Sequence, residues 1–374
     1  MNILKSAANI FVKPSIVFES IPNFSDNAKP VYDELVSRGY SRKYRMVWYI
    51  EQEQVASLKK NGKMVIWNPY ERRGVVAKIR NYSFFDKRKA NIICNRFLKK
   101  VSDEKTFYLK HGSPLKSVKG YYSVPKDIDY IISQSKAFEE ISATSNDVDP
   151  LKMVSLGFPR NDAFNKPKRD IDRLLLRNEK RVIVWYPTLR HHKNGFKTAS
   201  THAIPLLHDD DIARRIDEVA KNNDTLIVIK PHFAQDITAI KQLCLNNILF
   251  IDDSFFVKNH ISSYEFLNSC DALITDYSSV YYDYTLADKP IGVVWEDIEE
   301  YRQFPGFAVD LDYWMKGAEK IYTLQDLQTF ITNVAEGKDL LQKERREIRD
   351  FANYSCDGKN TERVVDFIIE KAQL

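Results

Sequence analysis

The chain has 374 residues, 44% of them hydrophobic, which is enough apolar material for two globular domains of ordinary size. No uncharged apolar run approaches the roughly 18 to 20 residues of a membrane-spanning helix, and the first residues lack a secretory signal, so we expect a cytoplasmic protein. The net charge of +5 is unevenly distributed: residues 1–160 hold 28 basic and 16 acidic side chains, and the remainder holds 28 and 35.

Short β-branched or aromatic runs alternate with helical patterns along the whole chain, which is typical of βαβ units around a largely parallel sheet. In the first half, residues 31–39 and 55–62 read as amphipathic helices that end at glycines. The strands expected there are Ser15–Glu19, Arg45–Ile50, Lys63–Trp67, Ala90–Cys94, Thr106–Lys110, Tyr130–Ser133 and Met153–Leu156.

A polar, charged stretch from Asn161 to Lys180 separates this half from a second series of strands. Two helical patterns, separated by Cys356-Asp357-Gly358, end the chain. The second strands are expected at residues 181–187, 225–232, 248–253, 272–278 and 290–295.

These patterns predict an α/β protein of two doubly wound, Rossmann-like domains that face each other across a cleft, with C-terminal helices. This arrangement is glycosyltransferase-B-like. We expect an N-terminal domain at residues 1–165 and a C-terminal domain at residues 166–374, the latter including the closing helices. Ligands of such sheets bind beyond the carboxyl ends of the strands, so the loops at strand ends are where chemistry is expected.

The first polar cluster at a strand end runs from Lys110 to Pro114 and contains His111. Gly112 permits a close backbone approach, and Ser113 adds a hydroxyl. A lone histidine is more often structural than catalytic. Its position in a loop beside glycine, serine and lysines keeps the catalytic interpretation open.

The second cluster, Lys230-Pro231-His232, closes a strongly apolar strand of the other half. Imidazole titrates near neutral pH, so either histidine can accept a hydroxyl proton or, when charged, stabilise phosphate oxygens. The alternative is that His232 only forms a hydrogen bond with a neighbouring loop.

The third cluster runs from Thr275 to Ser279 at the expected start of a helix, where hydroxyls and unpaired backbone N–H groups favour a diphosphate. An ordinary helix cap is the alternative. Arg160 and Arg190 each follow a strand and offer planar donors for phosphate oxygens, or are surface cations.

Taken in order, the segments HGSPLKSVKG, GFPRND, WYPTLR, KPHF and LITDYSSVYYDY resemble the motifs of the CDP-glycerol glycerophosphotransferase family, and VFES, SDN and DGKNTERVVDFI extend the resemblance over nearly the whole chain. Lys230 stands where that family often has arginine, and Pro305 stands where it usually has arginine. The resemblance implies a glycosyltransferase-B-like enzyme that transfers glycerol phosphate from CDP-glycerol to a growing teichoic acid or capsule polymer and releases CMP.

The resemblance also implies which residues carry the reaction. His111 and His232 match the essential histidines of the family, and His111 is favoured as the base. The residues expected to bind substrate are Lys110, Gly112, Ser113, Arg160, Thr188, Arg190, Lys230, Thr275, Asp276, Tyr277, Ser278, Ser279 and Asp283.

The expected partners are a CDP-alditol donor, a lipid-linked or polymeric glycan acceptor, and the anionic inner face of the bacterial membrane, to which the basic half is suited. No cofactor is expected, and no metal site is apparent. Nucleic acid is disfavoured because zinc-finger and RNP-like patterns are absent. The alternatives are a CDP-ribitol donor, a glycosyltransferase of the same architecture that uses a CMP- or UDP-sugar, and a non-catalytic polyanion-binding module.

Overall fold

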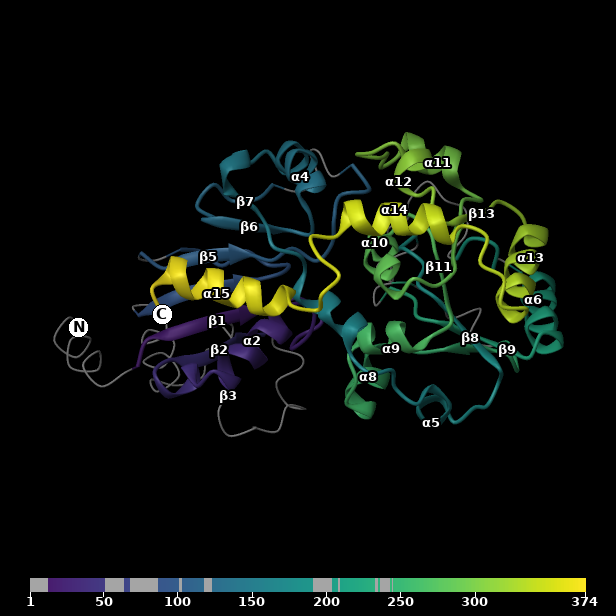
Figure 1. Cartoon of the computed structure of the whole chain (residues 1–374), viewed down its shortest axis with the longest axis horizontal. Coiled ribbons are helices and arrows are strands. Elements are labelled where there is room, and N and C mark those ends of the chain that lie inside the picture. The colour runs from purple at the N-terminus through teal and green to yellow at the C-terminus, as the bar shows by residue number, and fades with distance from the viewer. Residues whose placement is uncertain are drawn as a thin grey trace. The chain divides into compact units, whose positions relative to one another are not determined.

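The computed structural model describes residues 13–50, 87–100, 103–117, 123–190, 204–207, 209–232, 235, 243 and 245–374, and the backbone of residues 64–67. The helix expected at residues 55–62 lies outside this part. The chain divides into two compact units (Figure 1). The N-terminal unit comprises Met1–His111, Tyr122–Asp162 and Asp357–Leu374, and the C-terminal unit comprises Gly112–Tyr121 and Ala163–Cys356.

The N-terminal unit is built on a parallel sheet of seven strands in the order β3-β2-β1-β4-β5-β6-β7. The order reverses between β1 and β4, which is the switch point of a doubly wound sheet. All seven strands correspond to those expected from the sequence: β1 (Ser15–Glu19), β2 (Arg45–Tyr49), β3 (Met64–Trp67), β4 (Arg88–Ile93), β5 (Lys105–Tyr108), β6 (Tyr130–Ser133) and β7 (Met153–Ser155).

Helices cover both faces of this sheet. Along β1, Ile16 and Phe18 point into a core shared with helices α2 (Ala28–Ser37) and α15 (Asn360–Ala372). Val17 points into a second core on the opposite face, where helix α4 (Glu139–Asn146) packs. This alternation follows from the two-residue period of a strand, and burial on both faces explains why β1 is apolar at consecutive positions.

The C-terminal unit repeats the design with six parallel strands in the order β10-β9-β8-β11-β12-β13, and its switch point lies between β8 and β11. Five of these strands were expected, and the short β13 was not. The strands are β8 (Arg181–Trp185), β9 (Thr225–Ile229), β10 (Ile248–Phe250), β11 (Ala272–Thr275), β12 (Ile291–Val294) and β13 (Glu319–Ile321).

On one face of the second sheet, helices α6 (Asp210–Asn222) and α13 (Leu324–Ala335) lie side by side and share its core (Figure 1). The other α-helices that the structure describes in this unit are α5 (Ile171–Leu175), α8 (Asp253–Asn259), α9 (Ser263–Ser269), α10 (Val280–Tyr284), α11 (Ile298–Gln303), α12 (Leu311–Trp314) and α14 (Gln342–Ala352). In the described part of the chain, no helix is both long enough and apolar enough to span a bilayer.

The structure corrects the expected domain boundaries in two places. The last helix, α15, belongs to the N-terminal unit, because Val364, Val365 and Ile368 are buried against α2 and the first sheet (Figure 1). The segment Gly112–Tyr121, expected in the N-terminal domain, belongs to the C-terminal unit. Its described residues pair there, since Leu115 O accepts from Ala308 N at 2.9 Å and Ser117 N donates to Gly306 O at 3.0 Å.

Candidate functional site

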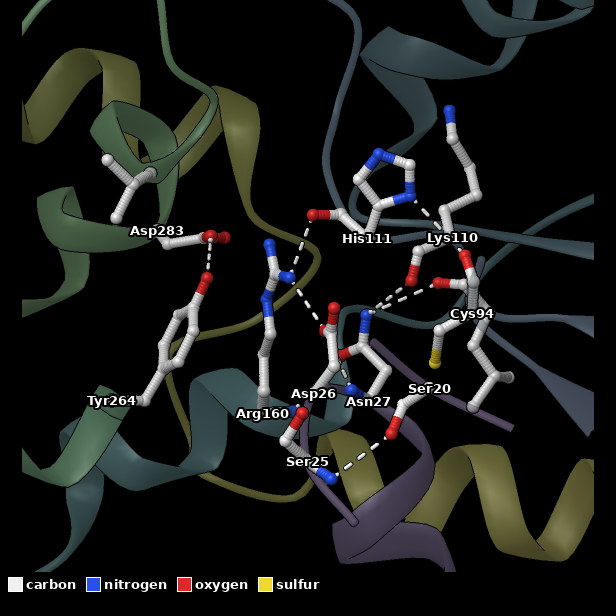
Figure 2. Close-up of polar contacts among 12 residues, drawn as sticks. Ser20, Ser25, Asp26, Asn27, Cys94, Lys110, His111, Arg160, Tyr264 and Asp283 are labelled. Carbon is white, nitrogen blue, oxygen red and sulfur yellow. Dashed lines mark hydrogen bonds and ion pairs between the residues drawn. The ribbon is translucent and has the colours of Figure 1, made fainter. Parts of the chain in front are cut away.

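The carboxyl ends of β1, β4 and β5 lie next to one another at the switch point of the first sheet. The loops that leave these ends carry Asp26 and Asn27, Cys94, and Lys110 and His111 (Figure 2). Adjacent parallel strands bring together residues that are far apart in the sequence, and this is where ligands of such sheets bind.

Asn27 fixes the backbone that precedes His111. Its buried amide donates to Leu109 O at 3.3 Å and to Lys110 O at 3.0 Å, and its side-chain oxygen accepts from Arg160 N at 3.1 Å. Lys110 has a positive φ of 59°, a backbone conformation that residues other than glycine seldom adopt. The Asn27 amide thus holds a strained turn directly before the histidine.

Arg160 links the loop after β1 to the histidine (Figure 2). Its Nη1 donates to Asp26 Oδ1 at 2.7 Å and to His111 O at 2.8 Å. The exposed fractions of the two charged side chains are only 7% for Arg160 and 12% for Asp26, so the pair is weakly screened. The structure shows that Arg160 fixes the main chain at His111, and its expected binding of phosphate stays a prediction.

The geometry defines which nitrogen of His111 is available. Nδ1 lies 3.3 Å from Cys94 O, and a carbonyl oxygen can only accept, so Nδ1 carries the proton in this contact. A neutral ring then has its lone pair on Nε2. This is the tautomer that a general base needs.

His111 keeps contact with solvent, but the surrounding protein removes part of its hydration shell. This desolvation lowers the pKa of the imidazole, Asp26 acts in the opposite direction, and the cations Arg160 and Lys110 lower the pKa further. A lowered pKa keeps the ring neutral near pH 7.

Lys110 is buried, and its Nζ donates to Ser142 Oγ in α4 at 2.8 Å. Among the described residues its ammonium has no carboxylate partner. Desolvation by burial therefore lowers the pKa of this lysine from 10.5 to about 8. The ammonium is held inside the N-terminal unit, so its expected role as a substrate ligand stays a prediction.

In the C-terminal unit, the Thr275–Ser279 segment begins at the last residue of β11, at the switch point. Its first three residues are buried and bound to protein: Thr275 donates to Tyr186 O at 2.8 Å, Asp276 accepts from Arg190 at 2.7 Å, and Tyr277 donates to Asp297 at 3.0 Å. Ser278 and Ser279 keep partial exposure. These two hydroxyls are therefore the part of the segment open to a ligand.

Arg190 is fully buried between two carboxylates. Its guanidinium donates to Asp276 and to Asp297 at 2.9 Å, and its Cζ lies 5.2 Å from the centre of the Tyr277 ring and 5.0 Å from that of Tyr301. Burial alone would lower the pKa of Arg190, but the two carboxylates outweigh it and raise the pKa. In the structure Arg190 holds these loops together, and its expected role as a phosphate ligand stays a prediction.

His232 and Lys230 leave the end of β9, next to β8. Lys230 Nζ lies 3.0 Å from Asp253 Oδ1 and 5.8 Å from the centre of the Tyr186 ring. Its charge is thus partly balanced by a carboxylate, which reduces its capacity to bind a phosphate. His232 is half-buried, and its main-chain oxygen accepts from Gln235 N at 2.8 Å.

Gly112 and Ser113 belong to the segment that packs within the C-terminal unit. A methyl group at residue 112 would lie 2.2 Å from Ser279 Oγ, far inside van der Waals contact. The close approach of the Ser279 side chain therefore favours glycine at this position. The other predicted ligands in this unit are buried: Ser113, Thr188, whose N–H donates to Asp276, and Asp283, whose carboxylate accepts from Tyr264 at 2.7 Å.

Sequence reasoning missed four residues that organise these loops: Asp26, Asn27, Gln235 and Asp297. The SDN segment contains the first two, but nothing in it distinguishes them from an ordinary helix start. Gln235 and Asp297 lie in no recognised motif. Within the residues that the structure describes, no group of three or more His, Cys, Asp or Glu side chains is arranged to hold a metal ion.

Comparison with known proteins gives one family. A family model described as CDP-glycerol:poly(glycerophosphate) glycerophosphotransferase matches residues 3–370. Curated relatives include two teichoic acid poly(glycerol phosphate) polymerases. The protein from Staphylococcus epidermidis is 26% identical over 83% of this chain and 42% of its own length, and that from Bacillus spizizenii is 22% identical over 95% and 91%. The chain thus spans less than half of the first relative and most of the second.

Solved structures agree on the fold. A structure of the wall teichoic acid polymerase TagF matches with a TM-score of 0.72 and 22% identity, covering 98% of this chain and 91% of that one. A second structure of TagF, soaked with CDPG, has a TM-score of 0.72 and 23% identity over 99% and 93%. The UDP-GlcNAc 2-epimerase from Neisseria meningitidis matches with a TM-score of 0.55 and 13% identity over 96% and 100%.

Proposed function

Because the chain belongs to the CDP-glycerol:poly(glycerophosphate) glycerophosphotransferase family, we propose that it transfers an alditol phosphate from a CDP-alditol to a hydroxyl of a glycan or polymer acceptor and releases CMP. CDP-glycerol is the proposed donor. The pathway is teichoic acid biosynthesis, to which the curated relatives from Staphylococcus epidermidis and Bacillus spizizenii are assigned.

One observation carries this proposal beyond family membership. In each unit, the loops at the switch point of the parallel sheet hold a polar cluster: Asp26, Asn27, Arg160 and His111 in the first, and the Ser278–Ser279 turn in the second. Such positions are where doubly wound sheets bind nucleotides and their reaction partners. We assign one cluster to each of the two substrates.

The proposed role of His111 is that of general base. Nε2 accepts the proton of the acceptor hydroxyl while that oxygen attacks the β-phosphorus of the donor. The bond between the β-phosphorus and the bridging oxygen breaks, and CMP leaves with that oxygen. The lowered pKa of His111 supports this role, because a base must be unprotonated at the working pH.

The proposed role of the C-terminal unit is to hold the donor. The Ser278 and Ser279 hydroxyls donate to diphosphate oxygens, and His232 with Lys230 offsets the charge that develops on the leaving CMP. These are electrostatic and positioning contributions, which dominate catalysis of phosphoryl transfer.

The acceptor is proposed to be lipid-linked, with the protein bound peripherally to an anionic membrane surface. The charge of residues 1–160 supports this, because the segment contains 28 basic and only 16 acidic side chains. Long-range attraction to anionic lipid brings such a surface to the membrane and orients it.

The proposal is tested by measuring CMP release from CDP-glycerol, CDP-ribitol and a CMP-sugar, each with a lipid-linked glycerol phosphate acceptor. We expect release from CDP-glycerol, dependent on the acceptor. Preferential turnover of CDP-ribitol would change the donor but keep the reaction class. Turnover of the CMP-sugar alone would replace the proposal with a glycosyltransferase.

A further inference from the structure

A continuous polar network joins the loops around the switch point of the C-terminal unit. At its centre, the buried Arg190 guanidinium donates to Asp276 at 2.7 Å and to Asp297 at 2.9 and 3.2 Å. Asp276 is fixed further by Thr188 N–H, which donates to its two oxygens at 3.1 and 3.0 Å. The carboxyl ends of β8, β11 and β12 are thereby tied together.

Gln235 extends this network to the loop after β9. Its side-chain oxygen accepts from Arg190 N–H at 2.8 Å, and its own N–H donates to His232 O at 2.8 Å. Gln235 is only 2% exposed, so these bonds do not compete with bulk water. A short series of contacts therefore runs from Asp276, through Arg190 and Gln235, to His232.

The two ends of this series carry the residues assigned to the donor. Asp276 lies two residues before Ser278, and His232 accepts directly from Gln235. Arg190 and Gln235 themselves are buried, with exposed fractions of 0% and 2%. Without Gln235, the main chain at His232 would lose its connection to Arg190, while the Asp276 side of the network would remain.

We infer that Gln235 is a positioning residue. Together with Arg190, it fixes the main chain at His232, after β9, relative to the turn at Ser278 and Ser279, after β11. The inference rests on the proposed function, in which His232 and the Ser278–Ser279 turn hold the donor diphosphate. Binding groups must be held to within a fraction of an ångström, and a displacement of about 1 Å can reduce activity by about a hundredfold.

Gln235 is a cleaner test than Arg190, because removing Arg190 would leave Asp276 and Asp297 buried without a cation and would threaten folding. Gln235→Met keeps the length of the side chain and the main-chain bond to His232 but removes the acceptor for Arg190 N–H. We expect kcat/KM for CDP-glycerol to fall by roughly tenfold to a hundredfold. Gln235→Glu keeps an acceptor oxygen in either protonation state and should recover most of this loss. The exposed Gln325→Met in α13 is the matched control.

A double-mutant cycle separates positioning from general destabilisation. If Gln235 acts through His232, Gln235→Met should add little further loss in a His232→Ala background. Independent, multiplied losses would overturn the inference, as would wild-type kcat/KM in Gln235→Met or equal losses in the methionine and glutamate variants.

One measurement does not depend on the reaction. In NMR spectra, the ring signals of His232 should shift in Gln235→Met, whereas those of the exposed His260 should not. Unchanged His232 signals would overturn the inference. Failure of the wild-type chain to release CMP from CDP-glycerol would instead overturn the proposed function, with the NMR result still deciding the positioning role.

Discussion

Replacing Lys110 with methionine should stabilise the N-terminal unit, although lysine is the residue that the sequence links to substrate binding. The pKa of this ammonium falls from 10.5 to about 8 because burial removes its hydration. Each pKa unit corresponds to about 1.4 kcal/mol, so keeping this lysine charged in the folded state at pH 7 costs about 3 kcal/mol. Methionine has a similar length and no charge to desolvate.

The hydrogen bond from Lys110 to Ser142 reduces the gain. Losing it costs about 1 kcal/mol, which leaves a net stabilisation of about 2 kcal/mol for Lys110→Met at pH 7. The sign of the pH dependence follows from proton binding. Between pH 8 and pH 10.5 the unfolded lysine holds a proton that the folded one has released, so wild-type stability rises with pH across this window and is lowest below pH 8.

Urea unfolding at pH 7 and pH 10 measures both effects. The difference in stability between variant and wild type should be about 2 kcal/mol at pH 7 and should nearly vanish at pH 10. Comparison with wild type is needed because burial also lowers the pKa of Lys289 to about 8, which adds the same trend to both proteins. Hydrogen exchange of the β5 amides at pH 7 assigns the change to the N-terminal unit.

The same substitution should affect catalysis. Lys110 is one of the cations that lower the pKa of His111, so its removal should move the acidic limb of the pH profile of kcat/KM to higher pH. A variant that is less stable than wild type at pH 7, or whose stability rises towards pH 10 by as much as that of wild type, would refute the reasoning.

Four further predictions follow from the two units. His111→Ala and His232→Ala should each reduce CMP release by at least about a hundredfold. Calorimetry should show weaker CDP-glycerol binding only for His232→Ala. If either variant keeps near-normal turnover, the histidine replaced in it has a structural role. Combined Ser278→Ala and Ser279→Ala should weaken donor binding in calorimetry with little change in Tm, and the reverse pattern would mark an ordinary helix cap. Asn27→Leu removes the side-chain partner of two buried carbonyls and of the Arg160 N–H. It should lower the free energy of unfolding, measured by urea titration, by roughly 2 to 3 kcal/mol. A change below about 0.5 kcal/mol, which is typical of a surface substitution, would contradict the assigned contacts. Binding to anionic vesicles in a sedimentation assay should weaken steeply as salt rises, and binding that is insensitive to salt would exclude the electrostatic attachment.

The sequence by itself determined the described strands other than β13, and the positions of the two histidines. Runs such as Ser15–Glu19 and Tyr130–Ser133 are short, apolar and rich in β-branched or aromatic residues, and they form strands over the same residues in the structure. His111 and His232 were recognised because each follows such a run. This information is local: side-chain shape and the two-residue period of a strand act over a few neighbouring residues.

Only the tertiary structure decided which elements pack together and which polar groups remain accessible. The pattern of α15 shows that one face is apolar but not that the first sheet covers it. The sequence around Arg190 does not show that Asp297, 107 residues away, accepts a hydrogen bond from its guanidinium. Asn27 likewise gains its role from carbonyls 82 and 83 residues away. The burial and the hydrogen-bond partners of a polar group depend on residues that are distant in the sequence, and the local sequence pattern does not show which residues these are.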